Sequence, residues 1–205
     1  MADWEKIFKK SGKFFLRPQE DMNRVIKFLK KEKAKTILDL GCGTGRHTAL
    51  LARNGFEVYG TDISPHGLKL TREWLKSLGL RAKLKRLSCY KKFPFKDNSF
   101  DAVISTQVIH HNYHKKIKLC ISEIKRVLKP GGAVFITVSA SKYKGRASKF
   151  DVPEPRTYIP LNGLEKGVVH FIYTKKLMKT DFRDFKVLSI KKDEGNHYCL
   201  LGKRK

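Results

Sequence analysis

Apolar residues along the chain alternate between helical spacing and short continuous runs. Spacings of three and four residues predict helices, whereas short apolar runs predict buried strands. Helices are predicted over residues 18–34, 48–52, 65–78, 114–128 and 175–181. Strands are predicted over residues 36–40, 56–60, 82–87, 100–105, 133–138, 187–191 and 198–202. Because strands and helices alternate, the sequence predicts a single α/β domain with a parallel sheet.

The ends of two predicted helices are marked by residues that cap or break helices. Ser64 followed by Pro65 is typical of a helix start, because the hydroxyl accepts a free N–H group and proline fits the first turn. Gly79 is expected to end this helix, and the turn at residues 130–132 to end the helix over 114–128. These signals predict where each of the two helices ends and the chain returns to the sheet.

Regular spacing stops between Ser139 and Val169, where prolines and glycines interrupt the chain. A long irregular segment inside a compact domain is usually functional. We therefore expect residues 139–169 to form a lid-like loop, and residues 1–35 to form an N-terminal helical cap. Both segments are assigned to one domain over residues 1–205.

Charge points to a polyanionic partner. The chain has 45 Lys and Arg against 19 Asp and Glu, which gives a formal net charge of +26. Residues 69–96 contain ten Lys and Arg and the single acid Glu73. Such a surface is typical of proteins that neutralise nucleic-acid phosphates, so RNA is the expected partner.

Cysteine and histidine spacing predicts no metal site and no disulfide framework. The four cysteines are scattered without a CxxC pair, so reduced thiols are expected. His110 and His114 have helical spacing but lack a third ligand in any recognisable metal motif. No apolar run approaches the roughly 20 residues of a membrane helix, and no signal peptide is recognisable, so a cytoplasmic protein is expected.

A glycine-rich turn joins the first predicted strand to the next helix. Gly41, Gly43 and Gly45 stand two residues apart and allow the backbone to approach a ligand closely. This spacing differs from the dinucleotide pattern GxGxxG, and no Gly-Lys-Ser/Thr is present to bind a triphosphate. Asp62 ends the second strand, where its carboxylate can accept both hydroxyls of a ribose, and Asp39 can bind an amino group. The predicted ligand has a ribose and an amine but no phosphate.

Four motifs in this order resemble those of the class I S-adenosylmethionine-dependent methyltransferases. They are LDLGCGTGRH at residues 38–47, YGTDIS at 59–64, FPFKDNSFDAVIS at 93–105 and EIKRVLKPGG at 123–132. The resemblance implies a Rossmann-like doubly wound seven-stranded sheet with strand order 3-2-1-4-5-7-6 and the last strand antiparallel. It also implies that S-adenosylmethionine is the cofactor.

The resemblance further implies which residues bind the cofactor. Its methionine end is lined by Asp39, Gly41, Gly43 and His47, its ribose is bound by Asp62, and its adenine packs on Ile63. The rest of the predicted cofactor site consists of Cys42, Thr44, Gly45, Ser88, Cys89, Tyr90 and Gln107. The family usually has an Asp ahead of the FPF segment, and this chain has Cys89 there. Adenine recognition by backbone groups or by Ser88 is expected instead.

The methyl acceptor is expected at the end of the fourth strand, because open parallel sheets bind ligands at the carboxyl edge. His110 and His111 stand there, and one of them can act as a base for an oxygen or nitrogen acceptor, which Gln107 can orient. Further acceptor-pocket or lid residues are predicted at Trp4, Phe15, Tyr158 and His170.

The segment VIHH at residues 108–111 followed by EIKRVLKPGG resembles the wobble-uridine tRNA methyltransferases. It resembles the quinone-biosynthesis and tellurite-resistance types nearly as closely. The basic charge favours RNA, and tRNA in particular, as the acceptor. Small-molecule and protein acceptors stay open, as does a non-catalytic RNA-binding protein on the same fold.

Overall fold

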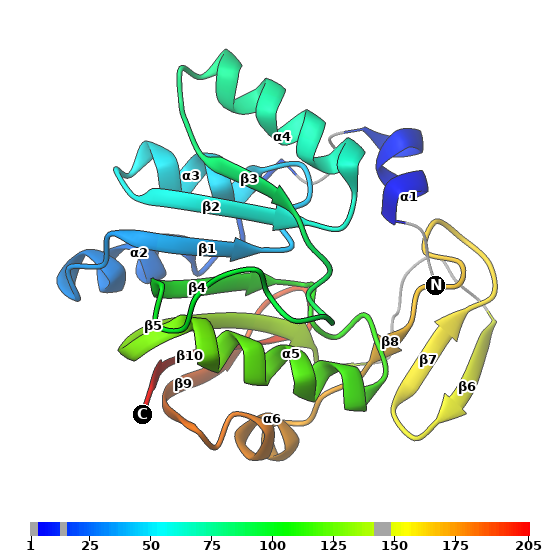
Figure 1. Ribbon diagram of the computed structural model, residues 1–205. Helices are drawn as coiled ribbons and strands as arrows, with labels where there is room; N and C mark the ends of the chain where they lie inside the picture. The colour runs from blue at the N-terminus through cyan, green and yellow to red at the C-terminus, as the bar shows by residue number, and fades with distance from the viewer. Residues whose placement is uncertain (1–3, 13–15, 142–148) are drawn as a thin grey trace.

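A computed structural model describes residues 4–12, 16–141 and 149–205. Its centre is a seven-stranded sheet with the order β3-β2-β1-β4-β5-β10-β9 (Figure 1). These strands are β1 (Thr36–Leu40), β2 (Glu57–Asp62), β3 (Lys83–Arg86), β4 (Phe100–Thr106), β5 (Leu128–Ser139), β9 (Phe185–Lys192) and β10 (His197–Arg204). Strand β10 pairs antiparallel with both β5 and β9. The predicted order and the antiparallel last strand are confirmed.

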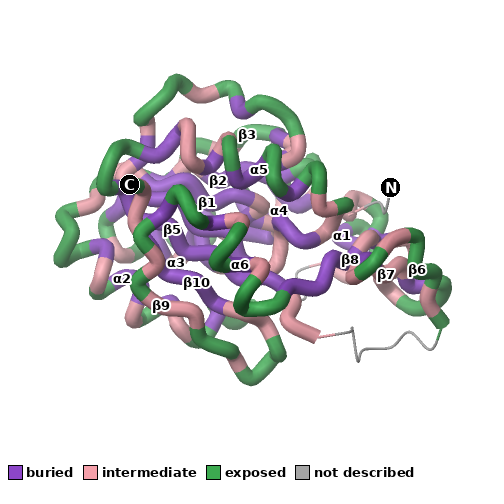
Figure 2. The backbone as a smooth tube through the Cα atoms, turned by 90° about the horizontal axis from the view of Figure 1, so that it is seen from below, coloured by how far each residue is buried: buried purple, intermediate pink, exposed green. Residues whose placement is uncertain are grey.

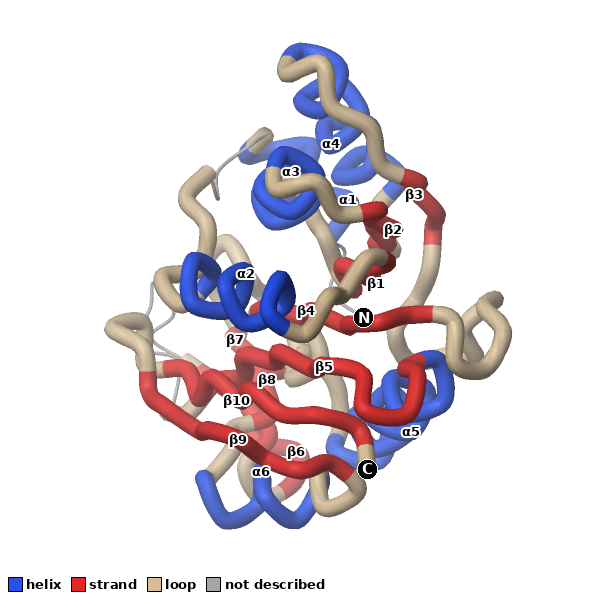
Figure 3. The backbone as a smooth tube through the Cα atoms, turned by 90° about the vertical axis from the view of Figure 1, so that its left-hand side faces the viewer, coloured by secondary structure: helices blue, strands red, loops and turns tan. Residues whose placement is uncertain are grey.

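Helices cover both faces of this sheet (Figure 3). They are α1 (Trp4–Ser11), α2 (Met22–Lys31), α3 (Arg46–Arg53), α4 (Pro65–Ser77), α5 (His114–Val127) and α6 (Lys175–Asp181). Side chains alternate across a strand, so Ile37 packs in the core that includes α2 and α3, and Leu38 in the core that includes α5 and α6. The two cores are the two sides of one sheet.

The parallel strands β1, β2 and β4 all end at the same edge of the sheet, where α1 also lies (Figure 1). Figure 2 shows that the buried backbone follows the central strands and that exposed residues lie at the periphery. At the carboxyl edge, the ends of the buried central strands therefore lie beneath helix α1. No helix within residues 4–12, 16–141 and 149–205 has the length and apolarity to cross a membrane.

The expected irregular segment contains a second sheet. Strands β6 (Phe150–Glu154), β7 (Thr157–Pro160) and β8 (His170–Phe171) form it in the order β6-β7-β8. The prediction of a loop without regular structure is wrong here, because these strands are too short to show a period and Pro153 lies inside one of them. Residues 142–148 of the predicted lid lie outside the described residues.

Helix α2 begins four residues later than predicted. Pro18 was expected in its first turn, but Met22 is its first residue. The preceding Gln19 is committed to other contacts, since its side-chain Oε1 accepts the Asp21 N–H at 2.8 Å and its backbone N–H is donated to His47. The segment before α2 therefore serves to hold the third helix in place.

Candidate functional site

The turn between β1 and α3 requires glycine at three positions. Gly41, Gly43 and Gly45 have φ angles of 78°, 56° and 97°, which are strained for residues with a Cβ atom. The N–H groups of Gly41 and Cys42 both donate to the Thr61 carbonyl, at 2.7 and 2.8 Å. The turn is thus fastened to the neighbouring strand β2. Because these two amides are already bonded within the protein, they are not available to a ligand carboxylate.

Asp62 stands at the end of β2 and organises the turn. Its Oδ2 accepts the Gly43 N–H at 2.8 Å, and its Oδ1 accepts the Ser64 N–H at 2.9 Å. Burial raises the pKa of Asp62, while the hydrogen bonds from the backbone of Ser64 and Gly43 oppose this rise. Ile63 is 43% exposed beside it. A ribose at Asp62 and an adenine ring on Ile63 fit this arrangement.

Asp39 lies near the end of β1, two residues before Gly41. The Thr48 hydroxyl donates to its Oδ2 at 2.6 Å. Burial raises the pKa of Asp39 to about 6, although the bond from Thr48 and the charge of Arg46 lower it. A bound ammonium group would favour the ionised carboxylate, so Asp39 could hold the amino group of a cofactor.

His47 occupies a different position from the one that the resemblance implied. Its Nε2 accepts the Gln19 backbone N–H at 3.0 Å, which places the ring proton on Nδ1, 2.9 Å from the Thr106 hydroxyl. Burial lowers the pKa of His47 well below its ordinary value. Both ring nitrogens are already bonded within the protein. His47 therefore fixes α3 against β4, and the histidine is buried beneath the turn.

Arg46 is a site residue that the sequence reasoning missed. Its guanidinium lies in the first turn of α3 and donates to Gln107 Oε1 at 3.3 Å and to the Arg17 carbonyl at 3.2 Å. It is half-buried, near the carboxyl group of Asp39. A guanidinium binds carboxylates strongly, so Arg46 could hold the carboxylate of the cofactor. The sequence signal that could have identified Arg46 is its position directly after Gly45, the last glycine of the turn.

The predicted adenine side is only partly assembled. The Cys89 thiol is buried and hydrogen-bonds with Cys120, so it points into the core rather than toward Asp62. Ser88 is half-buried, and Tyr90 donates its hydroxyl to the Val108 carbonyl at 3.1 Å. Among these three predicted residues, the Ser88 hydroxyl is the best placed to meet an adenine amine. Thr44 and Cys42 are buried within the turn.

Helix α1 lies across the glycine turn. A Cβ atom on Gly43 would come within 3.4 Å of the Phe8 ring, and one on Gly67 within 3.1 Å of the same ring. Glu5 accepts the Ser64 hydroxyl at 2.6 Å and the His66 N–H at 2.9 Å. These hydrogen bonds lower the pKa of Glu5 to about 2. The predicted N-terminal cap thus contacts the turn that the cofactor motif encodes.

Three histidines meet beyond the end of β4. Gln107 takes a φ of 60° and turns the chain so that His110 and His111 follow, with ring centroids 4.1 Å apart. His170 on β8 lies 4.8 Å from the His111 ring, and Phe171 donates its N–H to the His110 carbonyl at 2.8 Å. The two sheets are therefore joined at this point. The sequence named all three residues but did not place them together.

Two nitrogen atoms of the histidine cluster are buried without a hydrogen bond in the part of the chain that the structure describes. Burial lowers the pKa of His110 well below its ordinary value and that of His111 to about 3, so both rings are neutral. In the described part of the chain, neither His110 Nδ1 nor His111 Nδ1 has a hydrogen-bond partner. An unpaired buried polar atom costs about 1–3 kcal/mol, which suggests that these nitrogens have another partner in the working protein.

The remaining predicted acceptor residues surround this cluster. The Trp4 ring meets His111 edge-on at 5.0 Å and lies 5.8 Å from Phe8. Tyr158 on β7 is opposite His170 in the small sheet. Phe15 lies outside the described residues. Trp4 and His170 therefore both contact His111, and Tyr158 pairs with His170 across β7 and β8; their role in an acceptor pocket stays a prediction.

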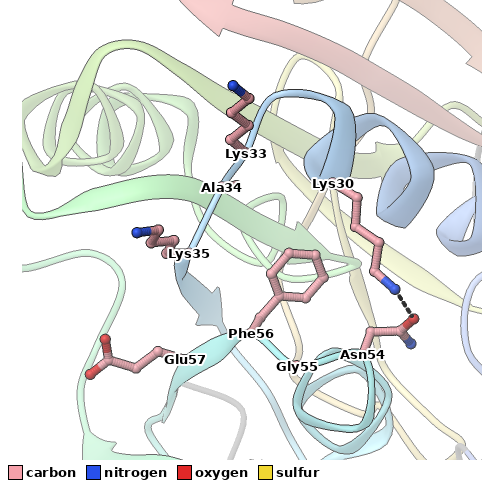
Figure 4. Close-up of a pocket in the computed structure, with 8 residues that line it drawn as sticks. All are labelled: Lys30, Lys33, Ala34, Lys35, Asn54, Gly55, Phe56 and Glu57. Atoms are coloured by element: carbon pink, nitrogen blue, oxygen red, sulfur yellow. Dashed lines mark hydrogen bonds between the residues drawn. The ribbon is translucent and has the colours of Figure 1, made fainter.

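A separate pocket lies at the other edge of the sheet and does not belong to this site. Figure 4 shows its lining, with the Phe56 ring between the starts of β1 and β2. Lys30 donates to Asn54 Oδ1 at 3.1 Å across its rim, and Lys33 and Lys35 extend beside it. Parallel sheets bind ligands at the carboxyl ends of their strands, so this amino-end pocket is not the cofactor site.

Known proteins share the motifs and the fold. Residues 38–136 match a family model described as a methyltransferase domain. The human protein named probable tRNA methyltransferase 9B is 35% identical over 126 residues, which are 60% of this chain and 26% of that protein. Demethylmenaquinone methyltransferase from Tropheryma whipplei (strain Twist) is 32% identical over 123 residues, which are 60% of this chain and 49% of that protein. The chain thus spans only part of the length of these relatives.

The fold extends the similarity over nearly the whole chain. The PH0226 protein from Pyrococcus horikoshii OT3 superposes with a TM-score of 0.78, at 24% identity, and the match covers 98% of this chain and 99% of that one. The matched motifs contain Asp39, the glycine turn and Asp62 in the geometry described above. Residues 38–136 therefore form a methyltransferase domain, and the whole chain has the fold of solved S-adenosylmethionine-dependent methyltransferases, which supports membership of the class I superfamily and S-adenosylmethionine as the cofactor.

Proposed function

We propose that this chain transfers the methyl group of S-adenosylmethionine to an oxygen or nitrogen atom of RNA. The observation that supports RNA is the basic surface formed by α4, β3 and the segment after β3. All ten Lys and Arg of residues 69–96 are exposed, beside the single acid Glu73. Neutralising phosphates with such groups releases counterions and gives affinity that depends steeply on salt.

The basic surface reaches the cofactor site. Arg86 at the end of β3 donates its Nε to the Ile63 carbonyl at 3.2 Å, directly beside Asp62. Leu87 donates its N–H to the Asp62 carbonyl at 2.9 Å. An RNA held on this surface would have its backbone near the edge at which the cofactor binds. This continuity favours RNA over a small molecule, which would gain nothing from the exposed lysines.

The relatives differ in the acceptors that their names state. One is named as a tRNA methyltransferase and another as a demethylmenaquinone methyltransferase. The basic surface supports the RNA acceptor in our proposal. A small-molecule acceptor is the second candidate function, because the rings of Trp4, His111 and His170 contact one another in an aromatic cluster near the cofactor turn.

Within the site, His111 is the residue that we assign to the acceptor. It is half-buried, whereas His110 is buried, so His111 is the more accessible of the two. During transfer, the acceptor atom forms a bond to the methyl carbon, the carbon–sulfur bond breaks, and S-adenosylhomocysteine leaves. The acceptor proton passes to the neutral His111 ring or to water. Because burial makes His111 a weak base, alignment of the acceptor contributes more than proton abstraction.

Other residues have supporting roles in this proposal. Asp39 and Arg46 hold the methionine amine and carboxylate, and Asp62 holds the ribose. Gln107, whose side-chain amide contacts Arg46 and His197, orients the acceptor. Helix α1 is the cap over the cofactor turn, and the small sheet is the lid over the acceptor.

The test is transfer of labelled methyl groups from S-adenosylmethionine into total cellular RNA and, in parallel, into a small-molecule extract free of nucleic acid. The proposal expects label in RNA. Label found only in the extract would replace RNA by the second candidate. Salt-sensitive RNA binding without transfer to either fraction would indicate a non-catalytic RNA-binding protein.

A pair of matched variants tests the surface itself. The triple variant Lys76→Gln, Lys91→Gln, Lys92→Gln removes three exposed charges from the basic surface. The control Lys186→Gln, Lys191→Gln, Lys192→Gln removes three exposed charges from β9 at the far edge of the sheet. For single-stranded RNA, each lost phosphate contact lowers the slope of log affinity against log salt by about 0.7. The first variant should lose slope and the control should not.

A further inference from the structure

We propose that His110, His111 and His170 bind a divalent transition metal ion of the zinc class. One nitrogen from each ring lies within 4.8 Å of the other two. The site goes beyond the proposed methyl transfer and does not depend on the nature of the acceptor. It was not expected from the sequence, because His170 is distant along the chain and only the small sheet brings it to the others.

The spacing of the nitrogens is close to what a metal centre needs. Zinc binds imidazole nitrogen at about 2.0–2.1 Å, so two nitrogens on a tetrahedral ion are about 3.4 Å apart. The three nitrogens lie within 4.8 Å of one another, so metal binding requires them to move closer together. The backbone need not move, since Phe171 N–H is already bonded to the His110 carbonyl at 2.8 Å.

The chemistry of the donors suits a transition metal. The Nδ1 atoms of His110 and His111 are buried and have no hydrogen-bond partner in the part of the chain that the structure describes. The neutral imidazole is the form of histidine that binds metal. Imidazole nitrogen selects zinc, cobalt, nickel or copper over magnesium and calcium, which prefer oxygen ligands.

A carboxylate supports one of the ligands. Glu165 Oε2 lies 3.2 Å from His170 Nε2, and the side chains of both residues are largely buried. Carboxylates beside ligand histidines fix the ring orientation and raise its basicity. Three protein ligands leave a fourth position open, as in catalytic zinc sites. His111 cannot hold a metal and accept a proton with the same lone pair, so a loaded site would exclude its proposed role as base.

Metal binding is tested on tag-free protein that has been stripped with chelator, without cofactor or acceptor. Titration with Co²⁺ should give the visible absorption of a tetrahedral nitrogen-ligated ion at one equivalent, and Zn²⁺ should displace it. The variants His111→Gln and His170→Gln should each weaken Zn²⁺ binding by more than about 100-fold, and Glu165→Gln by about 10- to 100-fold. The control His66→Gln changes a histidine at the start of α4 and should bind Zn²⁺ as the parent does.

Folding is checked separately from binding. Zn²⁺ should raise the thermal midpoint of the parent and of His66→Gln, but not that of His111→Gln or His170→Gln. If a variant fails to fold, X-ray absorption of the Zn²⁺-loaded parent takes its place, and scattering from three imidazoles is expected. Absence of stoichiometric binding, unchanged affinity in both histidine variants, or fewer than two imidazoles on the metal would overturn the site. Since no methyl transfer is measured, failure of the RNA proposal would leave this result unaffected.

Discussion

The carboxylate of Asp62 accepts the Gly43 N–H with 2.8 Å between Oδ2 and nitrogen, so one side chain sets the shape of the cofactor turn. We expect Asp62→Ala to lower S-adenosylmethionine affinity by at least about 100-fold, because each hydrogen bond to a charged group contributes about 1.5–3 kcal/mol. Isothermal titration calorimetry measures this loss. Asp151→Ala, at an exposed carboxyl group on β6, is the matched control. Micromolar affinity in Asp62→Ala would remove Asp62 from the site.

Asp39 predicts a pH dependence of stability in the cofactor-free protein. Burial raises the pKa of Asp39 to about 6, above the value of about 4 in an unfolded chain. Its contribution to stability is therefore fully present below pH 4 and is lost as the pH rises to about 6, by at most about 3 kcal/mol. Asp39→Asn should abolish this component. Urea unfolding of both proteins between pH 4 and 7 checks it, and parallel curves would contradict it.

Substitution of Gly45 by alanine should destabilise the protein more than the same substitution at Gly55, which also has a positive φ. A Cβ atom on Gly45 would lie 2.8 Å from Thr71 Cγ2, whereas one on Gly55 would meet nothing within 4 Å, and both have positive φ. Gly55→Ala should lose about 1 kcal/mol of unfolding free energy from backbone strain alone. Gly45→Ala should lose more, since Thr71 must move. Equal losses in denaturant titrations would contradict the crowding.

The fluorescence of Trp4 reports on the surroundings of helix α1. The chain has two tryptophans, so Trp74→Phe leaves Trp4 as the single tryptophan. Because α1 covers Gly43 through Phe8, saturating S-adenosylmethionine should shift the Trp4 emission. In the reciprocal variant Trp4→Phe, Trp74 on α4 should respond less. A Trp4 signal that does not change during a titration in which calorimetry shows binding would mean that α1 does not meet the cofactor.

Arg126 should be irreplaceable by lysine. Its guanidinium donates to Glu123 Oε1 at 2.8 Å and to the Phe93 and Phe95 carbonyls at 3.0 and 2.8 Å. Lysine cannot make these contacts together, so Arg126→Lys should lower the unfolding free energy by about 1–2 kcal/mol. Lys125→Gln, which removes a surface pair with Asp184, should change it by less than about 1 kcal/mol. Equal effects would contradict the role of Arg126.

Most of the main sheet could be predicted from the sequence because its elements have strong local signals. The predicted helix over 175–181 coincides with α6, and Ser64 caps α4 by accepting the Gly67 N–H at 2.9 Å. The predicted helix over 114–128 is confirmed by α5, but the predicted break at residues 130–132 is wrong, because α5 ends at Val127 and these residues lie within strand β5. Residues next to each boundary determine where these helices begin and end, so a single sequence is enough to predict them.

The features that could not be predicted depend on contacts between residues that are distant in the sequence. Pro18 signals a helix start, but the Gln19 bond to His47 delays it, and no local pattern reveals that bond. Strands β6 and β7 are stabilised by pairing with each other rather than by their own spacing. The meeting of His170 with His111 requires this small sheet, so the sequence could name both residues without placing them together.

Helix α1 touches the cofactor turn through Phe8 and the histidine cluster through Trp4, which are one helical turn apart. A short helix moves as a rigid rod, so lifting it from Gly43 also withdraws Trp4 from His111. Exchange of spent cofactor and exposure of the histidines are then a single opening event. The contacts of α1 thus couple access to the cofactor turn with access to the histidine cluster.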